Sequence, residues 1–599
     1  SDPLAAADRF AAAGPGPVLE RARLEAWLDA LRRGAAGSAR WRAFLSERSP
    51  ARLEAPAVLA LAAALAAEGD RDAAVSVLVA APARARVEAD LALFDLGDAD
   101  AVAAAAHRLA RDAPERLRAR SRELERFALA TFDPGDWLAR AAAWRAAGLG
   151  SRGAAELRGR RWSGTEERER RLELARSELD TGSPRRALDA LPASDDPESL
   201  VVRAEAERRR GWQRIPDPGA SRLFARCLDA AERASAAATG DTLESALGLV
   251  LECGTESGNL AAATDAWRRL EASGWADDRR DWLGRRLGVA LARSATDLGA
   301  VAEIAAALPA HGRCLTFWIA EATGNRQALE SLASGTFTDL YGRWAAAATG
   351  AGDNPWHPPA DVGPVEPPWS VAWLLDQAGD GEASDEWQHL LRRRRPGRAE
   401  ALAAADLADR AGRVNTAIRT LRSAFPALGS TEMADVPRDV VLAYLPLRWP
   451  EHLIAAARET GLDPWLIAAV ARQESVFTAH ARSPAGALGV LQLLPGTARP
   501  HARALGLGSR PDLLDPAINI RLGARELAGL VARFGAVEPA LAAYNAGERR
   551  ARDWRRRWPD PRVFAESVPI PETSTYVRRV VFLADAYRIA HAETWRHSP

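Results

Sequence analysis

The sequence predicts an all-α or mostly α chain that begins with an α-superhelix of stacked helix pairs, and three observations lead to this fold class. Residues 1 to about 350 show helical periodicity with almost no alternating strand pattern. A unit of two Ala/Leu-rich helices around a Gly turn recurs loosely, as at 58–78, 172–191 and 401–425. Such pairs stack because neither helix can bury its apolar face alone. From about residue 447, tight Gly/Pro turns and dense polar motifs replace this pattern.

These changes along the 599 residues predict three domains, since the chain is too long for one ordinary core. We expect a superhelical helix-pair domain over 1–365 and a small helical linker domain over 366–446. A third domain over 447–599 holds the polar motifs. Many of the 20 Trp lie in the helical region at spacings more typical of core packing than of sugar stacking. Examples are Trp137, Trp144, Trp212, Trp267 and Trp318.

Composition argues against several classes of function. The formal net charge is zero, and the 80 basic residues are all Arg, interleaved with acids as on solvated helix faces, which disfavours nucleic-acid binding. No apolar run is long enough for an integral membrane segment. The chain starts at Ser1 without a signal segment, as expected of a mature or trimmed protein. No metal or cofactor motif is present. Cys227, Cys253 and Cys314 lack metal-ligand spacing and are expected to be buried thiols, with a single disulfide left open.

A glutamate on the apolar side of a helix is the first candidate for chemistry. Asp463-Pro464 predicts a helix start, because Asp is a good N-cap and Pro fits the first helical position. Counted from there, Glu474 shares a face with Ile467 and Val470. Partial desolvation there would raise its pKa, which suits a general acid near neutral pH. On this helix alone, a core-edge Glu paired with an Arg is the more common interpretation.

Polar motifs downstream of Glu474 make a general acid the favoured interpretation of this residue. Ser483-Pro484-Ala485-Gly486-Ala487 is a run of small residues that allows close approach to a ligand. Gln492 stands between apolar neighbours ahead of Pro495, which precedes a predicted helix. Ala-Tyr-Asn-Ala-Gly over 543–547 predicts a helix end capped by Gly547. Glu-Thr at 572–573 then precedes Tyr-Val at 576–577.

In this order, the motifs resemble those of the soluble lytic transglycosylases over about residues 445–590. The helical region before them is similar to the superhelical part of the large members only in texture and placement, and the block at 383–387 is similar to their linker domain. The resemblance implies a lysozyme-like catalytic domain that cleaves the β-1,4 bond between N-acetylmuramic acid and N-acetylglucosamine in peptidoglycan. The product would carry a 1,6-anhydromuramic end.

The resemblance also implies roles for individual residues. Glu474 matches the catalytic acid/base, and Tyr544 and Asn545 match the pair that orients the acid and the sugar. The substrate-binding positions implied are Ser475, Ser483, Gln492, Leu494, Tyr544, Asn545, Glu572 and Tyr576.

A single acid is consistent with this reaction. No Asp or Glu follows Glu474 until Asp512, so no local second carboxylate is visible. Glu474 would protonate the glycosidic oxygen, the substrate N-acetyl group would stabilise the developing cation, and Glu474 would then deprotonate the muramyl 6-hydroxyl. Glu572 could instead activate water if it lies close by. The chain departs from the family pattern at Leu491 and Leu494, where Met is common, and at Ser574, where Arg is common.

Two other functions stay open on the sequence. One is a goose-type lysozyme-like hydrolase with the same acid, and the other is an inactive wall-binding scaffold whose helical array recruits partners. The leading interpretation expects a periplasmic monomer that acts on peptidoglycan strands without cofactor or nucleic acid. Other cell-wall enzymes are candidate partners of its helical domain. Exo or endo cleavage, preference for bare or peptide-bearing strands, closure of the superhelix and inhibitors do not follow from the sequence.

Overall fold

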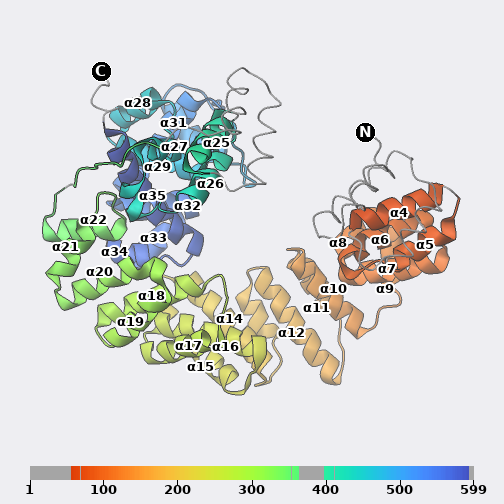
Figure 1. The fold of residues 1–599 in the computed structure, drawn as a ribbon. Helices are drawn as coiled ribbons and strands as arrows, with labels where there is room; N and C mark the ends of the chain where they lie inside the picture. The colour runs from red at the N-terminus through yellow and green to blue at the C-terminus, as the bar shows by residue number, and fades with distance from the viewer. Residues whose placement is uncertain (1–54, 68, 353, 363–396, 411, 593–599) are drawn as a thin grey trace. The chain divides into compact units, whose positions relative to one another are not determined.

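The computed structural model describes residues 55–67, 69–352, 354–362, 397–410 and 412–592, and its regular structure is helical (Figure 1). β-type pairing in these ranges is limited to isolated bridges, from Arg482 to Leu488 and from Leu488 to Leu493. The predicted fold class is therefore confirmed. No helix in these ranges is both long and apolar enough to cross a membrane.

The chain forms two compact units, which are described separately. The first unit is built from residues within 1–210 and 229–246, and the second from 211–228 and 247–599. The predicted boundary at 365/366 and the linker block at 383–387 lie outside the described residues, and the boundary at 446/447 falls inside the second unit. The three-domain division therefore stays a prediction.

The helices of the first unit are α4 Ala55–Ala67, α5 Arg71–Val79, α6 Arg86–Leu96, α7 Ala99–Asp112, α8 Pro114–Arg120, α9 Arg122–Leu129, α10 Pro134–Ala146, α11 Gly150–Arg158, α12 Gly164–Asp180 and α13 Pro184–Ala190. The division between the units falls within α14 Pro197–Arg214, α15 Gly219–Ala237 and α16 Gly240–Ser257. The second unit continues with α17 Leu260–Ser273, α18 Arg280–Ser294, α19 Leu298–Ala307, α20 Gly312–Thr323, α21 Arg326–Ala333, α22 Leu340–Thr349, α25 Arg398–Arg410, α26 Val414–Ala424 and α27 Arg438–Tyr444. Its last part holds α28 Pro450–Thr460, α29 Pro464–Glu474, α30 Pro495–Ala504, α31 Pro516–Phe534, α32 Val537–Ala546, α33 Glu548–Arg557, α34 Pro561–Ser567 and α35 Pro571–Ala590.

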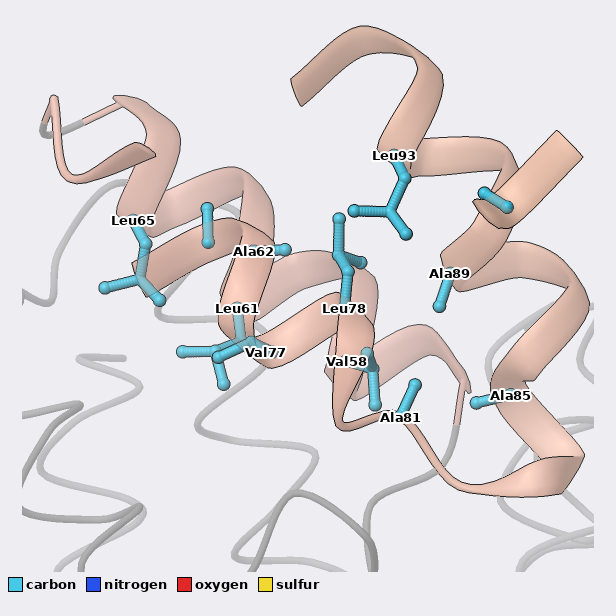
Figure 2. Close-up of a cluster of buried hydrophobic side chains, with 12 residues drawn as sticks. Val58, Leu61, Ala62, Leu65, Val77, Leu78, Ala81, Ala85, Ala89 and Leu93 are labelled. Atoms are coloured by element: carbon cyan, nitrogen blue, oxygen red, sulfur yellow. The ribbon is translucent and has the colours of Figure 1, made fainter. Parts of the chain in front are cut away.

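The predicted helix pairs are confirmed as α4/α5, α12/α13 and α25/α26. Their turns contain Gly69, Gly182 and Gly412, each with a positive φ that an L side chain rarely adopts. After Gly69, the Asp70 side chain accepts the backbone N–H of Ala73 at 3.2 Å and starts α5. The stacked faces of α4, α5 and α6 bury small and branched aliphatic side chains against one another (Figure 2). The Ala/Leu pattern of the sequence thus predicts which side chains pack between these helices.

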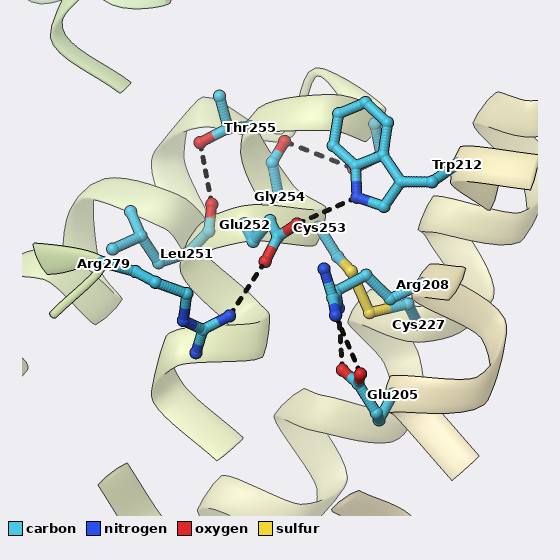
Figure 3. Close-up of a disulfide and its surroundings, with 11 residues drawn as sticks. Glu205, Arg208, Trp212, Cys227, Leu251, Glu252, Cys253, Gly254, Thr255 and Arg279 are labelled. Carbon is cyan, nitrogen blue, oxygen red and sulfur yellow. Dashed lines mark hydrogen bonds and ion pairs between the residues drawn. A yellow bond between two sulfur atoms is a disulfide. The ribbon is translucent and has the colours of Figure 1, made fainter. Parts of the chain in front are cut away.

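The tryptophans of the helical region are mainly core residues, as predicted. Trp144 is fully buried, Trp137, Trp267 and Trp318 are also buried, and Trp212 is partly exposed. The Trp212 indole N–H donates to Glu252 at 2.9 Å (Figure 3). Indole burial with a satisfied N–H is typical of a structural role.

All three cysteines are buried, as predicted, and two of them form the disulfide that the sequence leaves open. Cys227 on α15 and Cys253 on α16 are joined by a disulfide with a Cα–Cα separation of 6.1 Å (Figure 3). Cys314 on α20 is a buried free thiol, as predicted. The pairing depends on how α15 and α16 pack, which the spacing of 26 residues does not reveal.

Candidate active site

The candidate acid lies on the helix that the sequence predicts, and it is the last residue of that helix. α29 begins at Pro464 with Asp463 as its N-cap, whose carboxylate accepts the Trp465 N–H at 3.0 Å. Residues 465–472 are all buried, so α29 is covered on every side and not on one face only. Glu474 is its last residue. α29 packs along α35, which carries Glu572 and Tyr576.

The carboxyl group of Glu474 is mostly buried and bonded to a tyrosine. The Tyr576 hydroxyl donates to Glu474 Oε1 at 2.7 Å. Among the described residues no arginine pairs with Glu474, so the common alternative of a core-edge ion pair is not what forms here. Burial raises the pKa of Glu474 to about 7, the negative charge of Glu572 adds to the rise, and the hydrogen bond from Tyr576 opposes it. The predicted rise in pKa is thus confirmed.

The chain turns sharply after Glu474. Val476 and Phe477 have φ angles of 53° and 56°, in the left-handed region that costs a β-branched or bulky residue about 1–3 kcal/mol. Phe477 N–H nevertheless bonds back to the Ala471 carbonyl at 3.3 Å, and its ring is buried. The turn ends α29 at the acid.

Ser475 supports this turn from inside. Its hydroxyl donates to the Val490 carbonyl at 2.7 Å and accepts the Thr478 N–H at 3.1 Å. The residue is 8% exposed. The structure therefore gives Ser475 a role in joining α29 to the loop before α30, and its predicted contact with substrate stays a prediction.

The loop from Arg482 to Leu494 presents the next group of predicted residues. Ser483 Oγ accepts the Ala487 N–H at 3.0 Å and closes the small-residue turn. Gln492 has a φ of 47°, and its amide donates to the Gly489 carbonyl at 2.8 Å and the Ala481 carbonyl at 3.3 Å. The Gln492 amide is thus bonded to carbonyls of its own chain segment. Leu494 stands at the start of α30 with 45% of its surface exposed, which is unusual for Leu in this chain.

A buried asparagine that the sequence analysis missed holds the same loop. Asn519 on α31 is fully buried and accepts the Leu491 N–H at 2.7 Å. Its amide donates to the Leu488 carbonyl at 2.9 Å and the Leu513 carbonyl at 2.8 Å. A Cβ at Gly489 would lie 2.1 Å from the Leu513 carbonyl, so only Gly fits there. An Asn between Ile518 and Ile520 was the available signal, because a polar residue inside an apolar helical pattern needs a partner.

The end of α32 brings the Tyr-Asn motif to the same site. The Tyr544 hydroxyl donates to the Leu491 carbonyl at 2.7 Å, and burial together with the charge of Glu474 holds the pKa of Tyr544 well above its ordinary value. Asn545 Oδ1 accepts the hydroxyl of Thr573 at 2.6 Å. Gly547 caps the helix with a φ of 93°, as predicted. The hydrogen bond to the acid therefore comes from Tyr576, while Tyr544 supports the loop.

Glu572 is the second carboxylate of the site. It lies in the first turn of α35 and is exposed. Its negative charge raises the pKa of Glu474. No group of three or more His, Cys, Asp or Glu side chains in the described part of the chain could hold a metal ion. The chemistry available from these residues is proton transfer by one poised acid.

Comparison with known families identifies this part of the molecule. Residues 451–562 match the family model described as the transglycosylase SLT domain. The chain contains an SLT domain. The matched range includes Glu474, the loop at 482–494 and the Tyr-Asn motif. Glu572 and Tyr576 follow it on α35.

Proteins with similar sequences are also named as transglycosylases. The soluble lytic murein transglycosylase of Escherichia coli K12 is 39% identical over 127 residues, which are 20% of this chain and 20% of that protein. The corresponding protein of Salmonella typhimurium is 35% identical over 153 residues, or 24% of this chain and 23% of that protein. The matches thus span about a fifth of the length of the curated relatives.

A solved structure resembles nearly the whole chain in fold. The lytic transglycosylase Slt from Pseudomonas aeruginosa, solved as an inactive mutant, matches with a TM-score of 0.56 and covers 97% of this chain and 92% of that one. Its sequence identity is 21%, so this likeness shows the fold alone. It extends the agreement beyond the SLT domain to the helices before it.

Proposed function

We propose that this protein is a peptidoglycan lytic transglycosylase, with Glu474 as the only catalytic carboxylate. It would cleave the β-1,4 bond between N-acetylmuramic acid and N-acetylglucosamine and leave a 1,6-anhydromuramic end. The observation that carries the proposal is the state of Glu474: a buried carboxyl at a helix end, with its pKa raised to about 7 and a tyrosine as its hydrogen-bond partner. The SLT domain and its relatives support the same reaction.

In the first step, protonated Glu474 gives its proton to the glycosidic oxygen. The bond from this oxygen to C1 of the muramyl residue then breaks, and the N-acetylglucosamine side leaves as an alcohol. The oxygen of the muramyl N-acetyl group stabilises the positive charge that develops at C1. Glu474 is left as a carboxylate, and the hydrogen bond from Tyr576 stabilises it in that form.

In the second step, the Glu474 carboxylate takes the proton of the muramyl 6-hydroxyl. The freed oxygen bonds to C1 and closes the 1,6-anhydro ring, so no water is consumed and Glu474 is protonated again. One group that serves first as acid and then as base works best with a pKa near the working pH. A pKa of about 7 meets that requirement near neutrality.

Substrate contacts are proposed for the residues around Glu474. Leu494 offers an exposed apolar surface beside the loop, and Glu572 offers an exposed carboxylate at the start of α35. The other proposed contact residues are Ser475, Ser483, Gln492, Tyr544, Asn545 and Tyr576.

A goose-type hydrolase is the second candidate function, because the negative charge of Glu572 raises the pKa of Glu474. A second carboxylate that activated water would produce reducing ends in place of anhydro ends. Tyr576 is the group bonded to the acid, and Glu572 is exposed, which favours the transglycosylase.

The test is to digest purified sacculi in water enriched in ¹⁸O and to analyse the products by mass spectrometry. A transglycosylase gives anhydromuropeptides without ¹⁸O. A hydrolase gives reducing ends that carry ¹⁸O, and this result would overturn the proposal. Absence of any product that depends on the protein would instead favour a wall-binding scaffold.

The setting of this reaction is also proposed. The curated relatives are named for action on murein, which supports a periplasmic place of action for this chain. We propose that it acts there as a monomer. The helical region outside the SLT domain would then be the surface for other cell-wall enzymes.

A further inference from the structure

The first turn of α35 is attached to three different helices within the second unit. Thr573 donates to Asn545 at the end of α32, at 2.6 Å, and Tyr576 donates to Glu474 at the end of α29, at 2.7 Å. These two residues are three apart and therefore share a face of α35. Ser574 lies about 100° away around the helix and accepts a hydrogen bond from Arg285 on α18, at 3.1 Å. The first turn of α35, which carries Tyr576, is thus also held from another side by a side chain of α18.

The contact at Ser574 is fully buried and lies beside a buried ion pair. Arg285 and Ser574 are both 0% exposed. Arg285 also pairs with Glu566 on α34, which is 2% exposed, and Arg578 donates to Ser574 at 2.8 Å. A buried charge that loses its partner is strongly destabilising, so this network has one favoured arrangement and resists movement of the groups in it.

Neighbouring contacts join the same two regions. Arg286 on α18 donates to the Val568 carbonyl at 3.5 Å, between α34 and α35, and pairs with Glu256 on α16. The Cys314 thiol on α20 lies 3.8 Å from Glu566 Oε1. The α34–α35 corner is therefore held by side chains from α18 and α20 that precede it by more than 240 residues.

We propose that Arg285 is a positioning residue for the Glu474 site: through Ser574 it fixes the first turn of α35, so that Tyr576 keeps its hydrogen bond to Glu474. Ser574 thus accepts a hydrogen bond from one guanidinium on α18, that of Arg285, and from one on α35 itself, that of Arg578. The helical array thus contributes to the geometry of the acid without touching substrate. This inference rests on the proposed function for its catalytic consequence, but its structural part can be tested without activity.

The test uses the double variant Arg285→Met/Glu566→Gln in the full chain. It removes the buried ion pair as a unit and keeps similar volumes, which avoids an unpaired buried charge. The matched control is Arg140→Met/Glu125→Gln/Glu156→Gln in the first unit, since Arg140 is also 0% exposed and pairs with Glu125 at 2.5 Å and with Glu156 at 2.9 Å. Ser574→Ala is a second variant that leaves the pair between Arg285 and Glu566 in place. It keeps the test decisive if the double variant does not fold.

Two readouts separate positioning from a general loss of stability. The first is the titration midpoint of the Glu474 carboxyl, followed by ¹³C NMR. Since the Tyr576 hydrogen bond lowers the Glu474 pKa, loosening that bond moves the midpoint to higher pH, in the same direction as Tyr576→Phe. The second is kcat on glycan strands, which we expect to fall between about tenfold and a hundredfold while KM changes less, because misplacement acts on the proton transfers.

The expected result is an upward midpoint shift and a lower kcat in the Arg285 double variant and in Ser574→Ala, with no shift in the control. Folded variants with the wild-type midpoint would overturn the inference, as would an equal shift in the control. If the wild-type protein makes no anhydro products, the proposed function fails on its own, and the midpoint of Glu474 still decides whether Arg285 positions the turn.

Discussion

The buried acids on other helices and the acid at the end of α29 have different partners. Eight Asp and Glu side chains are buried in the described residues, and each is paired with an arginine. They are Asp90, Glu125, Glu173, Glu178, Glu207, Glu252, Glu566 and Asp585. Glu474 is mostly buried as well, but its partner is the Tyr576 hydroxyl.

The difference shows how one residue type serves structure in one place and chemistry in another. Burial raises the pKa of Glu173, but the charges of Arg145 and Arg176 oppose the rise. At Glu474 only a neutral hydrogen-bond donor opposes burial, and the charge of Glu572 reinforces it. An arginine keeps a buried carboxylate charged, whereas a tyrosine leaves it able to take and give a proton near neutral pH.

The largest expected effect is the loss of catalysis in Glu474→Gln. The amide cannot donate the first proton or accept the second, so we expect release of muropeptides from sacculi to fall by at least about a thousandfold. The circular dichroism spectrum should stay that of the wild type. Release at the wild-type rate would show that another group is the acid.

The same variant should change how stability depends on pH. The rise of the Glu474 pKa from 4.5 to about 7 means that the folded state favours the protonated form, so its stabilising contribution is full below pH 4.5 and is lost as pH rises through 7. This corresponds to about 3 kcal/mol. Glu474→Gln should therefore unfold at the same temperature as the wild type at pH 4 and at a higher temperature at pH 8. Equal unfolding temperatures at both pH values would contradict the raised pKa.

Breaking a structural ion pair should instead lower the stability of the fold. Arg140→Met leaves Glu125 buried without its main partner, so we expect a loss of about 3–5 kcal/mol in the free energy of unfolding, measured with urea. The pH dependence of kcat should be unchanged. A shift in that dependence would mean that the two kinds of buried acid are not independent.

A smaller effect is expected for Tyr576→Phe. Without its hydroxyl, the carboxylate form of Glu474 loses a hydrogen bond, which raises the Glu474 pKa and moves the alkaline limb of the kcat profile to higher pH. We expect kcat at the optimum to fall about tenfold, since a hydrogen bond to a charged group contributes about 1.5 kcal/mol or more. An alkaline limb at the same pH as in the wild type would show that Tyr576 does not affect the pKa of Glu474.

Glu572→Gln should have the smallest effect. Removing this exposed charge lowers the Glu474 pKa and moves the alkaline limb of kcat to lower pH, by less than the Tyr576→Phe shift and less again at high salt. Glu451, an exposed acid in the first turn of α28, provides the control in Glu451→Gln. Loss of anhydro products in Glu572→Gln would instead give Glu572 a direct catalytic role.

Local features of the site were accessible from the sequence. The cap at Asp463 and the 3.6-residue period predict a helix that begins at Pro464 and carries Glu474 on its apolar face, and Gly547 marks the end of α32. The helix pairs around Gly69 and Gly182 were predictable for the same reason, because turn and periodicity are local properties.

Long-range partners were not accessible in this way. Tyr576 bonds to Glu474 across 102 positions, and Arg285 reaches Ser574 across 289. These contacts follow from how helices pack, which a single sequence does not specify. Tyr576 and Ser574 were noted from the sequence as a site residue and as a departure from the family pattern, but nothing in the sequence pointed to Arg285.

The most direct test of the central claim is the titration of the Glu474 carboxyl in the wild-type protein by ¹³C NMR, with the signal assigned by its absence in Glu474→Gln. The account predicts a midpoint of about 7. A midpoint near 4.5, the ordinary value for a glutamate, would contradict the claim that a buried carboxyl without an arginine is the acid and base of this site.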